Sequence, residues 1–473
     1  MVFSSLEFLF LFLPVTLLLY YAVPKKYRVW RNVVLLVMSL VFYGWGEPKY
    51  VLLMVVTILA DYGAGLLIGW FRDGKDKPKA AKAVLISSIV LNLLILGFFK
   101  YYDFLVSNLR LIPGLGGLKT LGLALPVGIS FYTFQALSYV IDVYRDDARV
   151  QKNPISFGTY VTLYPQLVAG PIVRYQDVDD MLRDRTESRA LFASGVRTFL
   201  AGLGKKMLLG NVAGLMWDTV SAAPGRSVVG AWLGIIFYTF HIYFDFSGYS
   251  DMAIGLGKMI GFRFLENFNY PYIAESITDF WRRWHMSLST WFREYVYFPL
   301  GGSRCDKKWK NYRNIFIVWL LTGVWHGANW NYILWGLYYF VLLMIEKTFL
   351  KKYLDRAPSW VRHVYALFFI CIGWLIFAET DLAAGTVYLG NLFGIGATGF
   401  IDSVTLYDLA RNLPYLLLLG IASTPLPRKL FYRFYEKKPS FRTAAAVGGV
   451  LLLVVCTAYL VASSYNPFIY YIF

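Results

Sequence analysis

Long apolar segments, separated by short basic loops, recur along the whole chain. A helix needs roughly 20 apolar residues to cross about 30 Å of hydrocarbon, and most of these segments approach that length. The pattern predicts helices near residues 6–23, 32–46, 49–70, 83–106, 121–143, 192–220, 228–260, 311–325, 328–346, 360–379, 406–423 and 444–462. We therefore predict an all-α, polytopic membrane protein whose residues 1–473 form a single integral membrane domain.

Three segments depart from a simple row of spans. The turn at Gly46-Glu47-Pro48 predicts a hairpin between the second and third helices. Residues 154–173 are too short and too proline-rich for a confident span. We expect them to be re-entrant or interfacial, which is tolerated only where protein or a cavity surrounds the backbone. The first 23 residues lack a basic stretch and a small-residue cleavage site, so we interpret them as a retained helix and not a signal peptide.

Composition and charge support the same class of protein. Hydrophobic residues make up 58% of the chain and aromatic residues 19%, which excludes an ordinary soluble enzyme. The 46 basic residues outnumber the 29 acidic ones and gather between the apolar segments, as they do in cytoplasmic loops. No RNA-binding motif accompanies them, so the expected partner is the lipid bilayer and not nucleic acid. Basic residues 25–31 place the first loop in the cytoplasm, and twelve crossings then leave the C-terminus outside.

An imidazole inside a long apolar segment is the most unusual feature of the chain. Within residues 314–344, which include TGVWHGANWNYILWG, His326 is the only side chain that titrates near neutral pH. An ionisable group at membrane depth is unfavourable unless it is paired or faces a hydrated cavity, so it is a functional-site candidate. We expect tryptophans to surround it and glycines to allow close helix packing; the tryptophans are Trp325, Trp330 and Trp335. The structural alternative is a neutral histidine that joins two helices by a hydrogen bond.

A second unusual stretch, DFWRRWHMSLSTWFREYVYFPLGGSR at 279–304, places basic groups among tryptophans. It predicts an amphipathic helix that carries Arg282, Arg283, His285 and Arg293. Such a helix could lie at the membrane interface with its arginines near lipid headgroups. The functional alternative is a mouth in which the arginines bind an anionic, phosphate-bearing donor. His285 lies 41 residues before His326, so sequence spacing does not show whether they meet.

Two carboxylates interrupt the apolar stretch YFDFSGYSDMAIG. Asp245 and Asp251 need partners if they are buried. The expected partners are Arg282 and Arg283, in structural salt bridges.

The chain carries no motif of another catalytic class. It has no Walker loop, no GxSxG elbow and no zinc-type His/Cys cluster, and its three cysteines lack CxxC or metal spacing. Neither a bound metal nor a disulfide framework is expected. A buried imidazole would then act as a general base that takes a proton from a hydroxyl acceptor while an activated acyl group is attacked. His241 has no assigned role, and His363 is expected in a solvent-exposed basic loop.

Several long motifs, taken in order, resemble the membrane-bound O-acyltransferases. They are LPVGISFYTFQALSYVIDVYR, LVAGPIVRY, YFDFSGYSDMAIG, DFWRRWHMSLS and TGVWHGANW, and they extend over roughly residues 120–340. The first hundred residues match more loosely. The likeness is to the branch with the alginate and peptidoglycan O-acetylation membrane proteins, which is related to the D-alanyl transfer protein of teichoic acid. His241 stands where this branch often has glutamine.

The resemblance implies a fold and a set of site residues. The fold would be a ring of about 11–12 transmembrane helices around a thin central funnel, with re-entrant and amphipathic helices and a motif-bearing core at 120–346. The catalytic residues would be His326 and His285, and the candidates for donor binding are Arg282, Arg283 and Arg293. The acyl donor, acetyl-CoA, would be a substrate that enters from the cytoplasm of a bacterial plasma membrane, with no bound cofactor.

The C-terminal helix and aromatic tail, at 444–473, have a separate interpretation. The last eight residues, NPFIYYIF, look like the C-terminal aromatic motif of a small protein that accompanies the D-alanine transfer enzyme. That likeness implies an acyl relay on Tyr470, with Tyr471 as the fallback. The alternative is an aromatic anchor at the membrane interface.

The preferred function is transfer of an acetyl group across the membrane for O-acetylation of an alginate- or peptidoglycan-like polysaccharide outside. An SGNH-type transferase outside the membrane would be the partner. The alternative within the family is D-alanyl transfer from a carrier protein to teichoic acid. A transporter of polysaccharide or lipid-linked sugar would need paired half-helices and charged pathways, and no internal repeat of that kind is evident.

Overall fold

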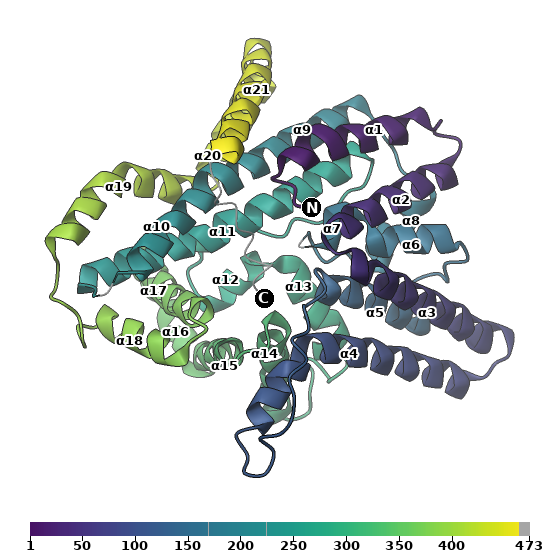
Figure 1. Ribbon diagram of the computed structural model, residues 1–473, viewed down its shortest axis with the longest axis horizontal. Helices are drawn as coiled ribbons and strands as arrows, with labels where there is room; N and C mark the ends of the chain where they lie inside the picture. Colours follow the sequence, from purple (N-terminus) through teal and green to yellow (C-terminus); the bar gives the residue numbers. More distant parts are fainter. Residues whose placement is uncertain (169, 224, 463–473) are drawn as a thin grey trace. The chain divides into compact units, whose positions relative to one another are not determined.

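The computed structural model describes residues 1–168, 170–223 and 225–462 (Figure 1). These residues form α-helices with short π- and 3₁₀-helical turns, and no strand occurs among them. They separate into two compact units, each built from two stretches of chain. Unit 1 combines Met1–Phe199 with Tyr249–Leu265, and unit 2 combines Leu200–Gly248 with Glu266–Phe473. The single functional domain expected over 1–473 stays a prediction.

Two of the three unit boundaries fall inside helices, namely α9 and α11, and the third follows Leu265 in the loop after α11. Up to the first boundary the elements are η1 Phe8–Phe12, α1 Leu13–Ala22, α2 Arg28–Gly46, η2 Pro48–Tyr50, α3 Val51–Gly69, η3 Trp70–Gly74, α4 Pro78–Leu109, α5 Ile129–Arg145, α6 Pro154–Thr162, α7 Tyr164–Leu167, α8 Tyr175–Arg183 and α9 Arg189–Gly204. The later elements are η4 Lys205–Gly210, α10 Asn211–Ser221, α11 Val228–Met259, η5 Pro271–Ile273, α12 Ile277–Arg283, α13 Met286–Phe292, η6 Arg293–Tyr297, α14 Lys308–His326, α15 Trp330–Ile345, η7 Glu346–Leu350, α16 Lys351–Leu354, α17 Ser359–Ala378, α18 Leu382–Leu392, α19 Ser403–Ala422, α20 Leu426–Lys437 and α21 Pro439–Ala462.

The described part of the chain contains seven helical segments that are long and apolar enough to cross a membrane. They are Arg28–Gly46, Pro48–Gly74, Pro78–Leu109, Val228–Met259, Trp330–Leu354, Ser359–Ala378 and Pro439–Ala462, with Phe8–Ala22 as a shorter apolar helix. The protein is therefore an all-α, multi-pass membrane protein, and the predicted fold class is confirmed. Helices also form at the other predicted positions, but some carry several charges, as α14 does with Lys308, Lys310 and Arg313.

Two differences from the predicted helices have local causes. α5 begins at Ile129 and not near 121, because the loop before it contains Pro126 and ends at Gly128 with a left-handed φ of 74°. α18 and α20 were not among the predicted helices. Both are short, and α20 is too rich in charge to resemble a span.

In unit 1, helices α3, α4 and α5 pack side by side (Figure 1). A buried carboxylate crosslinks two of them. Asp61 of α3 accepts hydrogen bonds from the Ser88 hydroxyl at 2.6 Å and from the Asn92 amide at 2.8 Å, both on α4. Both bonds go to the Oδ1 atom of a carboxylate that would be unfavourable in lipid, and they link the two helices.

A second buried cluster in unit 1 is ionic. The Glu187 carboxylate accepts from Arg28 at 2.5 Å, Arg31 at 2.8 Å and the Tyr20 hydroxyl at 2.6 Å, and Arg185 lies 3.9 Å away. Burial acts to raise the pKa of Glu187, but the hydrogen bonds from Arg28, Tyr20 and Arg31 outweigh it and lower the pKa to about 2. Glu187 therefore stays ionised and joins α1 and α2 to the loop before α9.

The proline-rich segment predicted as re-entrant or interfacial forms the short helices α6 and α7. Asn153 caps α6, since its side chain accepts from the backbone N–H groups of Ile155 and Ser156. All four residues of α7 are buried. Protein surrounds this segment as expected, because α6 packs against α2 within unit 1.

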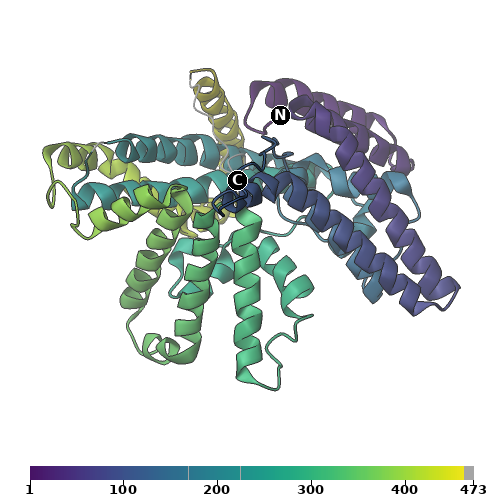
Figure 2. The same cartoon turned by 60° about the horizontal axis from the view of Figure 1, so that its bottom comes forward.

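In unit 2, α14 and α15 form a tightly packed helical hairpin, which Figure 2 shows among the green helices. A Cβ added to Gly323 would lie 2.5 Å from the Tyr332 carbonyl oxygen, and one added to Gly336 would lie 2.4 Å from that of Trp319. Only glycine fits at such separations, so the predicted close approach of the two backbones is confirmed at these positions. α17 packs against the other side of α15.

The partner of Asp245 differs from the predicted one. Asp245 of α11 forms a buried ion pair with Lys206, and Lys206 is also 3.4 Å from the Asn211 side chain. Lys206 lies in the π-helical turn η4, 39 residues before Asp245. The prediction that Arg282 and Arg283 pair with this carboxylate is therefore wrong, because a lysine already buried on the neighbouring helix satisfies it.

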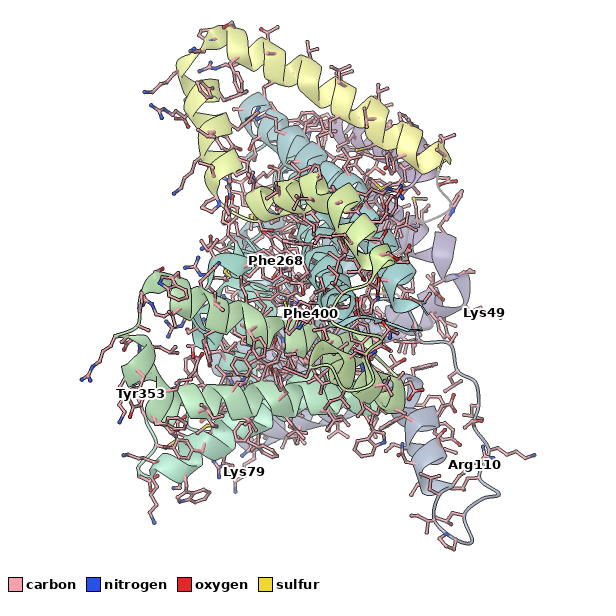
Figure 3. All side chains as sticks on the ribbon, turned by 90° about the vertical axis from the view of Figure 1, so that its left-hand side faces the viewer. Lys49, Lys79, Arg110, Phe268, Tyr353 and Phe400 are labelled. Atoms are coloured by element: carbon pink, nitrogen blue, oxygen red, sulfur yellow. The ribbon has the colours of Figure 1, made fainter. Side chains whose placement is uncertain are left out.

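Aromatic side chains fill much of the interior of unit 2. Phe268 packs edge-on against Trp284 at 5.0 Å and against Phe246 at 4.9 Å. Figure 3 shows Phe268 amid densely packed side chains, whereas Tyr353 lies at an outer edge. This aromatic packing surrounds the helices that carry the candidate site residues.

Candidate active site

The predicted amphipathic helix at 279–304 is broken into three pieces. α12 ends at Arg283, α13 begins at Met286, and the π-helical turn η6 follows. His285 lies at the break with a left-handed backbone, φ 44° and ψ 53°. A side-chain-bearing residue seldom adopts this conformation, and it persists only where surrounding contacts hold it. The single amphipathic helix expected from the sequence is therefore wrong, and His285 occupies the strained turn.

Asn267 holds the ring of His285 in one orientation. The Asn267 Oδ1 atom accepts from the Ser287 backbone N–H at 3.2 Å and from the Ser287 hydroxyl at 2.9 Å, which identifies it as the oxygen. His285 Nδ1 lies 3.1 Å from the same oxygen, so Nδ1 carries the hydrogen and donates. Nε2 is then the basic nitrogen of the ring.

His285 is a buried, neutral imidazole. It is 2% exposed, and the ring of Phe246 meets it edge-on at 4.8 Å. Burial lowers the pKa of His285 to about 3, since a nonpolar environment disfavours the charged form. The neutral ring can therefore accept a hydrogen bond through Nε2 at neutral pH.

His326 is the last residue of α14 and is enclosed by aromatic rings. Trp325 lies 5.0 Å from it between ring centroids, Trp335 4.9 Å and Phe377 5.2 Å, all edge-on. Trp330 was expected in this shell but is 48% exposed. Phe377 of α17 takes its place, which the sequence stretch around His326 does not reveal.

One cavity of unit 2 brings the two histidines together. His285 and His326 both line it, and Trp325 contacts the rings of both, at 6.2 Å and 5.0 Å. The other lining residues are Thr278, Trp281, Arg282, Trp284, Leu288, Ser289, Phe292, Val318, Trp319, Thr322 and Leu343. The cavity is mostly apolar and aromatic, and a few polar groups converge on it, which is the usual form of a small-molecule site.

The three arginines predicted for donor binding are placed differently from one another. Arg282 lines the cavity. Arg283 pairs with Asp279 at 3.0 Å, one helical turn away. Arg293 pairs with Glu294 at 3.1 Å and its side chain is 55% exposed. The structure thus brings Arg282 alone of the three into the wall of this cavity.

The remaining histidines lie outside the cavity lining. His241 is buried on α11, and its Nδ1 is 2.9 Å from the Gly210 carbonyl oxygen. His363 was expected in an exposed loop but is half-buried on α17, with Nδ1 3.1 Å from the Ala274 carbonyl oxygen. Tyr470 and Tyr471, predicted for the acyl relay, lie outside the described residues.

Sequence reasoning missed two polar residues that shape the site. Asn267 orients His285 from 18 residues away, and Glu346 hydrogen-bonds the start of α12 from 69 residues away. Neither residue belongs to a motif that signals chemistry, and long-range pairing of this kind leaves no periodic pattern in a single sequence. Within the described residues, no group of three or more His, Cys, Asp or Glu side chains could hold a metal ion.

The family follows from comparison with known proteins. Residues 145–386, about half of the chain, match the model of the membrane-bound O-acyltransferase family. The chain belongs to the membrane-bound O-acyltransferase family. The resemblance seen in its motifs is confirmed, and the protein is an acyltransferase. The matched region includes both histidines of the cavity.

Three relatives illustrate the range of similarity. The probable alginate O-acetylase AlgI of Pseudomonas aeruginosa is 44% identical over 399 residues, which cover 84% of this chain and 75% of the relative. The peptidoglycan O-acetyltransferase of Helicobacter pylori is 34% identical over 429 residues, covering 84% and 80%. The teichoic acid D-alanyltransferase of Bacillus subtilis is 33% identical over 270 residues, covering 53% and 68%.

Proposed function

We propose that this protein passes an acetyl group from cytoplasmic acetyl-CoA across a bacterial plasma membrane for O-acetylation of an extracytoplasmic polysaccharide. The observation that carries the proposal is that His285, His326 and Arg282 line one cavity. The relatives named for O-acetylation align with 84% of the chain, and the one named for D-alanyl transfer with 53%. That difference favours acetyl over D-alanyl as the group transferred.

In the proposed reaction, His326 is the general base. Its imidazole takes the proton from a hydroxyl group of the acceptor as the hydroxyl oxygen attacks the thioester carbonyl carbon of acetyl-CoA. A new C–O ester bond forms, the C–S bond breaks, and the departing thiolate receives the proton from the imidazolium. The products are the acetyl ester and free coenzyme A, so atoms and charge balance. The aromatic shell of Trp325, Trp335 and Phe377 holds the ring of His326 in place for this transfer.

His285 has a supporting role in the proposed reaction. Asn267 fixes its Nδ1–H, so that Nε2 is the atom that accepts a hydrogen bond from substrate in the cavity. Arg282 would meet the negative charge of a phosphate-bearing donor. Arg283 and Arg293 are already paired with carboxylates and would add a more general positive potential.

The outward half of the reaction involves two further proposals. Tyr470 would accept the acetyl group from the donor and present it outside, with His326 as the base that activates its hydroxyl. An SGNH-type transferase outside the membrane would then move the acetyl group to the polysaccharide. Replacement of Tyr470 by Phe distinguishes the acyl relay from an aromatic anchor at the membrane interface, because the ring remains and only the nucleophilic oxygen is lost. Full activity of Tyr470→Phe, with no acetylated C-terminal peptide in mass spectrometry, would rule out the relay.

The donor is tested with membranes that contain the full-length protein. The membranes receive either acetyl-CoA labelled in its acetyl group or a carrier protein loaded with labelled D-alanine. We expect label to leave acetyl-CoA in a reaction that His326→Ala abolishes and His363→Ala, a matched histidine outside the cavity lining, preserves. Transfer from the D-alanyl carrier alone would establish the alternative within the family. No transfer from either donor, together with export of a polysaccharide, would point to a transporter.

A further inference from the structure

Glu346 is a buried carboxylate at the junction of three helices of unit 2. It is 3% exposed and is the first residue of the π-helical turn η7, directly after α15. Single π-helical turns within helices are uncommon and occur often at functional sites. A carboxylate buried to this degree is strongly unfavourable unless hydrogen bonds satisfy it.

The hydrogen bonds to Glu346 come mainly from the first turn of α12. The Ile277 N–H donates to Oε1 at 2.6 Å, and Thr278 donates to Oε2 through its N–H at 2.9 Å and its hydroxyl at 2.6 Å. From α17, the Tyr365 hydroxyl donates to Oε1 at 3.2 Å. One side chain of the α15–η7 helix therefore holds both α12 and α17.

This contact suits the start of a short helix. The first N–H groups of a helix lack intrahelical partners, and a negative charge beside them is favourable. Ser276 supplies a local cap to the Asp279 N–H at 3.0 Å, whereas Glu346 supplies a cap from a separate helix. α12 has only seven residues, so its position depends on tertiary contacts more than on its own stability.

The cap on α12 is relevant to the reaction because α12 carries residues that line the cavity. Trp281 and Arg282 of α12 line the cavity, and the chain reaches His285 two residues after the helix ends. Trp281 packs edge-on against Trp335 of α15 at 5.5 Å, and Trp335 in turn contacts His326. A shift of α12 would therefore move one wall of the cavity relative to the other.

We propose that Glu346 is a positioning residue that fixes α12, and with it Arg282 and His285, against the α14–α15 hairpin that carries His326. The inference rests on the proposed active site. Glu346 does not line the cavity, whereas its hydrogen-bond partner Thr278 does. Its effect on the reaction passes through the backbone of α12 and not through contact with substrate.

The test compares kcat, KM and thermal midpoint of Glu346→Gln with the wild type. Glutamine keeps the shape but faces two backbone N–H donors with an amide that has a single acceptor atom. We expect kcat to fall about 10- to 100-fold, as displacement of a cavity wall by around 1 Å can produce, with a smaller change in KM. Glu346→Asp keeps the charge and should restore part of kcat.

Thr405→Val serves as the matched control for lost stability. It removes the buried hydrogen bond of 2.9 Å between Thr405 and Ser227, which lie outside the cavity lining in unit 2. Both variants are assayed well below their own thermal midpoints, so that all protein is folded. A kcat for Glu346→Gln equal to that of Thr405→Val would overturn the positioning role and leave only a structural one.

Two further measurements separate this inference from the proposed function. Activity of His326→Ala close to wild type would refute the active site itself, whatever Glu346 does. An inactive His326→Ala beside a fully active Glu346→Gln would refute the positioning role alone. Thr278→Val removes one donor to Glu346, so its effect on kcat should be non-additive with that of Glu346→Gln. If the effects of Thr278→Val and Glu346→Gln on kcat are strictly additive, the two residues do not act through the same displacement of α12.

A separate observation concerns α20, an amphipathic basic helix joined to the span α21 through Lys438 alone. No residue of α20 is buried. With 100° between successive residues, Leu426, Leu430 and Phe434 lie along one side of the helix. Lys429, Arg433 and Lys437 continue the surface on the adjacent side. Figure 3 shows nitrogen-tipped side chains projecting away from this helix.

Contacts within the described residues already use some of the basic side chains near α20. Arg428 pairs with Glu266 at 3.2 Å, and Arg442 donates to the Tyr435 carbonyl oxygen at 3.0 Å. The side chains of Lys429, Arg433 and Lys437 are on a helix with no buried residue, away from these two contacts. Because α21 is long and apolar enough to span a membrane and starts two residues after α20, we expect these three cations beside a membrane surface.

We propose that Lys429, Arg433 and Lys437 bind the phosphate headgroups of anionic phospholipids, while the apolar side of α20 enters the interface. Three or more cations beside a membrane span attract anionic lipid by about 1 kcal/mol each. The apolar side chains supply burial that a free phosphate ion could not use. An anionic phospholipid can therefore bind the basic side of α20 through its phosphate and cover the apolar side with the membrane interface.

The lipid site is tested by titrating the detergent-solubilised full chain with phosphatidylglycerol and following its thermal midpoint. Replacement of Lys429, Arg433 and Lys437 by Gln should raise the half-saturating concentration about 100-fold. The charge-matched control replaces three exposed lysines by Gln, namely Lys75 and Lys77 of the loop before α4 and Lys79 in the first turn of α4. An equal shift in that control, or equal stabilisation by phosphatidylcholine or inorganic phosphate, would overturn the proposal.

Discussion

Two buried clusters of ionisable side chains, one in each unit, have opposite designs. In unit 1, Glu187 is surrounded by Arg28, Arg31 and the Tyr20 hydroxyl at 2.5–2.8 Å. In unit 2, His285 and His326 face a cavity and are enclosed mainly by aromatic rings. The first cluster satisfies a charge with fixed partners, whereas the second places two imidazole rings in the wall of a cavity.

The difference indicates how polar groups that stabilise the fold of a membrane protein can be distinguished from polar groups that take part in a reaction. Burial alone does not separate them, because Glu187 and His285 are both buried. The distinguishing features are a cavity and a fixed tautomer. Asn267 sets the tautomer of His285, while nothing in the Glu187 cluster leaves room for a substrate on the carboxylate oxygen that Arg28, Arg31 and Tyr20 share. These features make each cluster respond differently to mutation.

The largest expected effect is on catalysis at His326. His326→Ala removes the proposed base, and general-base help is worth about 10²- to 10⁴-fold in rate. The rate of acyl transfer should fall by that factor while insertion and thermal midpoint stay near wild type. Transfer within a few-fold of wild type would end the catalytic assignment. His363→Ala, which changes a histidine bonded to the Ala274 carbonyl, is the matched control.

The opposite result is expected for the structural cluster. Glu187→Gln leaves Arg28 and Arg31 buried beside a neutral side chain, and loss of one partner from a buried ion pair is destabilising by about 3–5 kcal/mol. The thermal midpoint in detergent should fall strongly, while the kcat of the remaining folded protein stays near wild type. A normal midpoint with reduced kcat would place Glu187 in the reaction and reverse the comparison.

The sequence predicted the second cluster better than the first. His326 stands out because it is the lone imidazole in an apolar run, and the glycines near it indicated close packing that Gly323 and Gly336 bear out. Glu187 lies in a basic loop, where its pairing with Arg28 and Arg31, 159 and 156 residues away, has no local signal. Periodicity reports which face of a helix is apolar, but it does not report which distant helix supplies a charge.

The errors at α12–α13 have a similar origin. Amphipathic spacing from 279 onward indicated one helix, yet the chain turns at His285 with a positive φ. No glycine or proline marks that turn. Distant tertiary contacts hold it, since Asn267 bonds His285 and Glu346 caps the first turn of α12. The same limitation applies to Asp245, whose partner Lys206 is on another element.

The pH dependence of stability should separate the two clusters. The pKa of His285 is lowered from 6.5 to about 3 by burial. Unfolded protein therefore binds one proton more than folded protein between those values, and stability falls as pH drops below 6.5. The expected slope is about 1.4 kcal/mol per pH unit, and His285→Asn should remove it.

Glu187 affects stability at a lower pH than His285 does. Its pKa is lowered from 4.5 to about 2, so its contribution is complete above pH 4.5 and is lost as pH falls toward 2. Thermal midpoints measured between about pH 7.5 and 5 should thus have the wild-type slope in Glu187→Gln and a flatter slope in His285→Asn. An unchanged slope in His285→Asn would mean that His285 is not held neutral by the fold.

The smallest expected effects concern Arg282 and Arg293, and they test whether the donor phosphates bind at the cavity. Arg282 lines the cavity, whereas Arg293 pairs with Glu294 and is more than half exposed. Arg282→Gln should therefore raise the KM for acetyl-CoA roughly threefold to tenfold, and it should weaken the dependence of KM on salt, because one screened attraction to the donor phosphates is lost. Arg293→Gln should change KM less than about twofold, as expected for a solvent-exposed ion pair. If Arg293→Gln has the larger effect, the donor phosphates bind outside this cavity, and His285 and His326 would receive the acyl group from another direction.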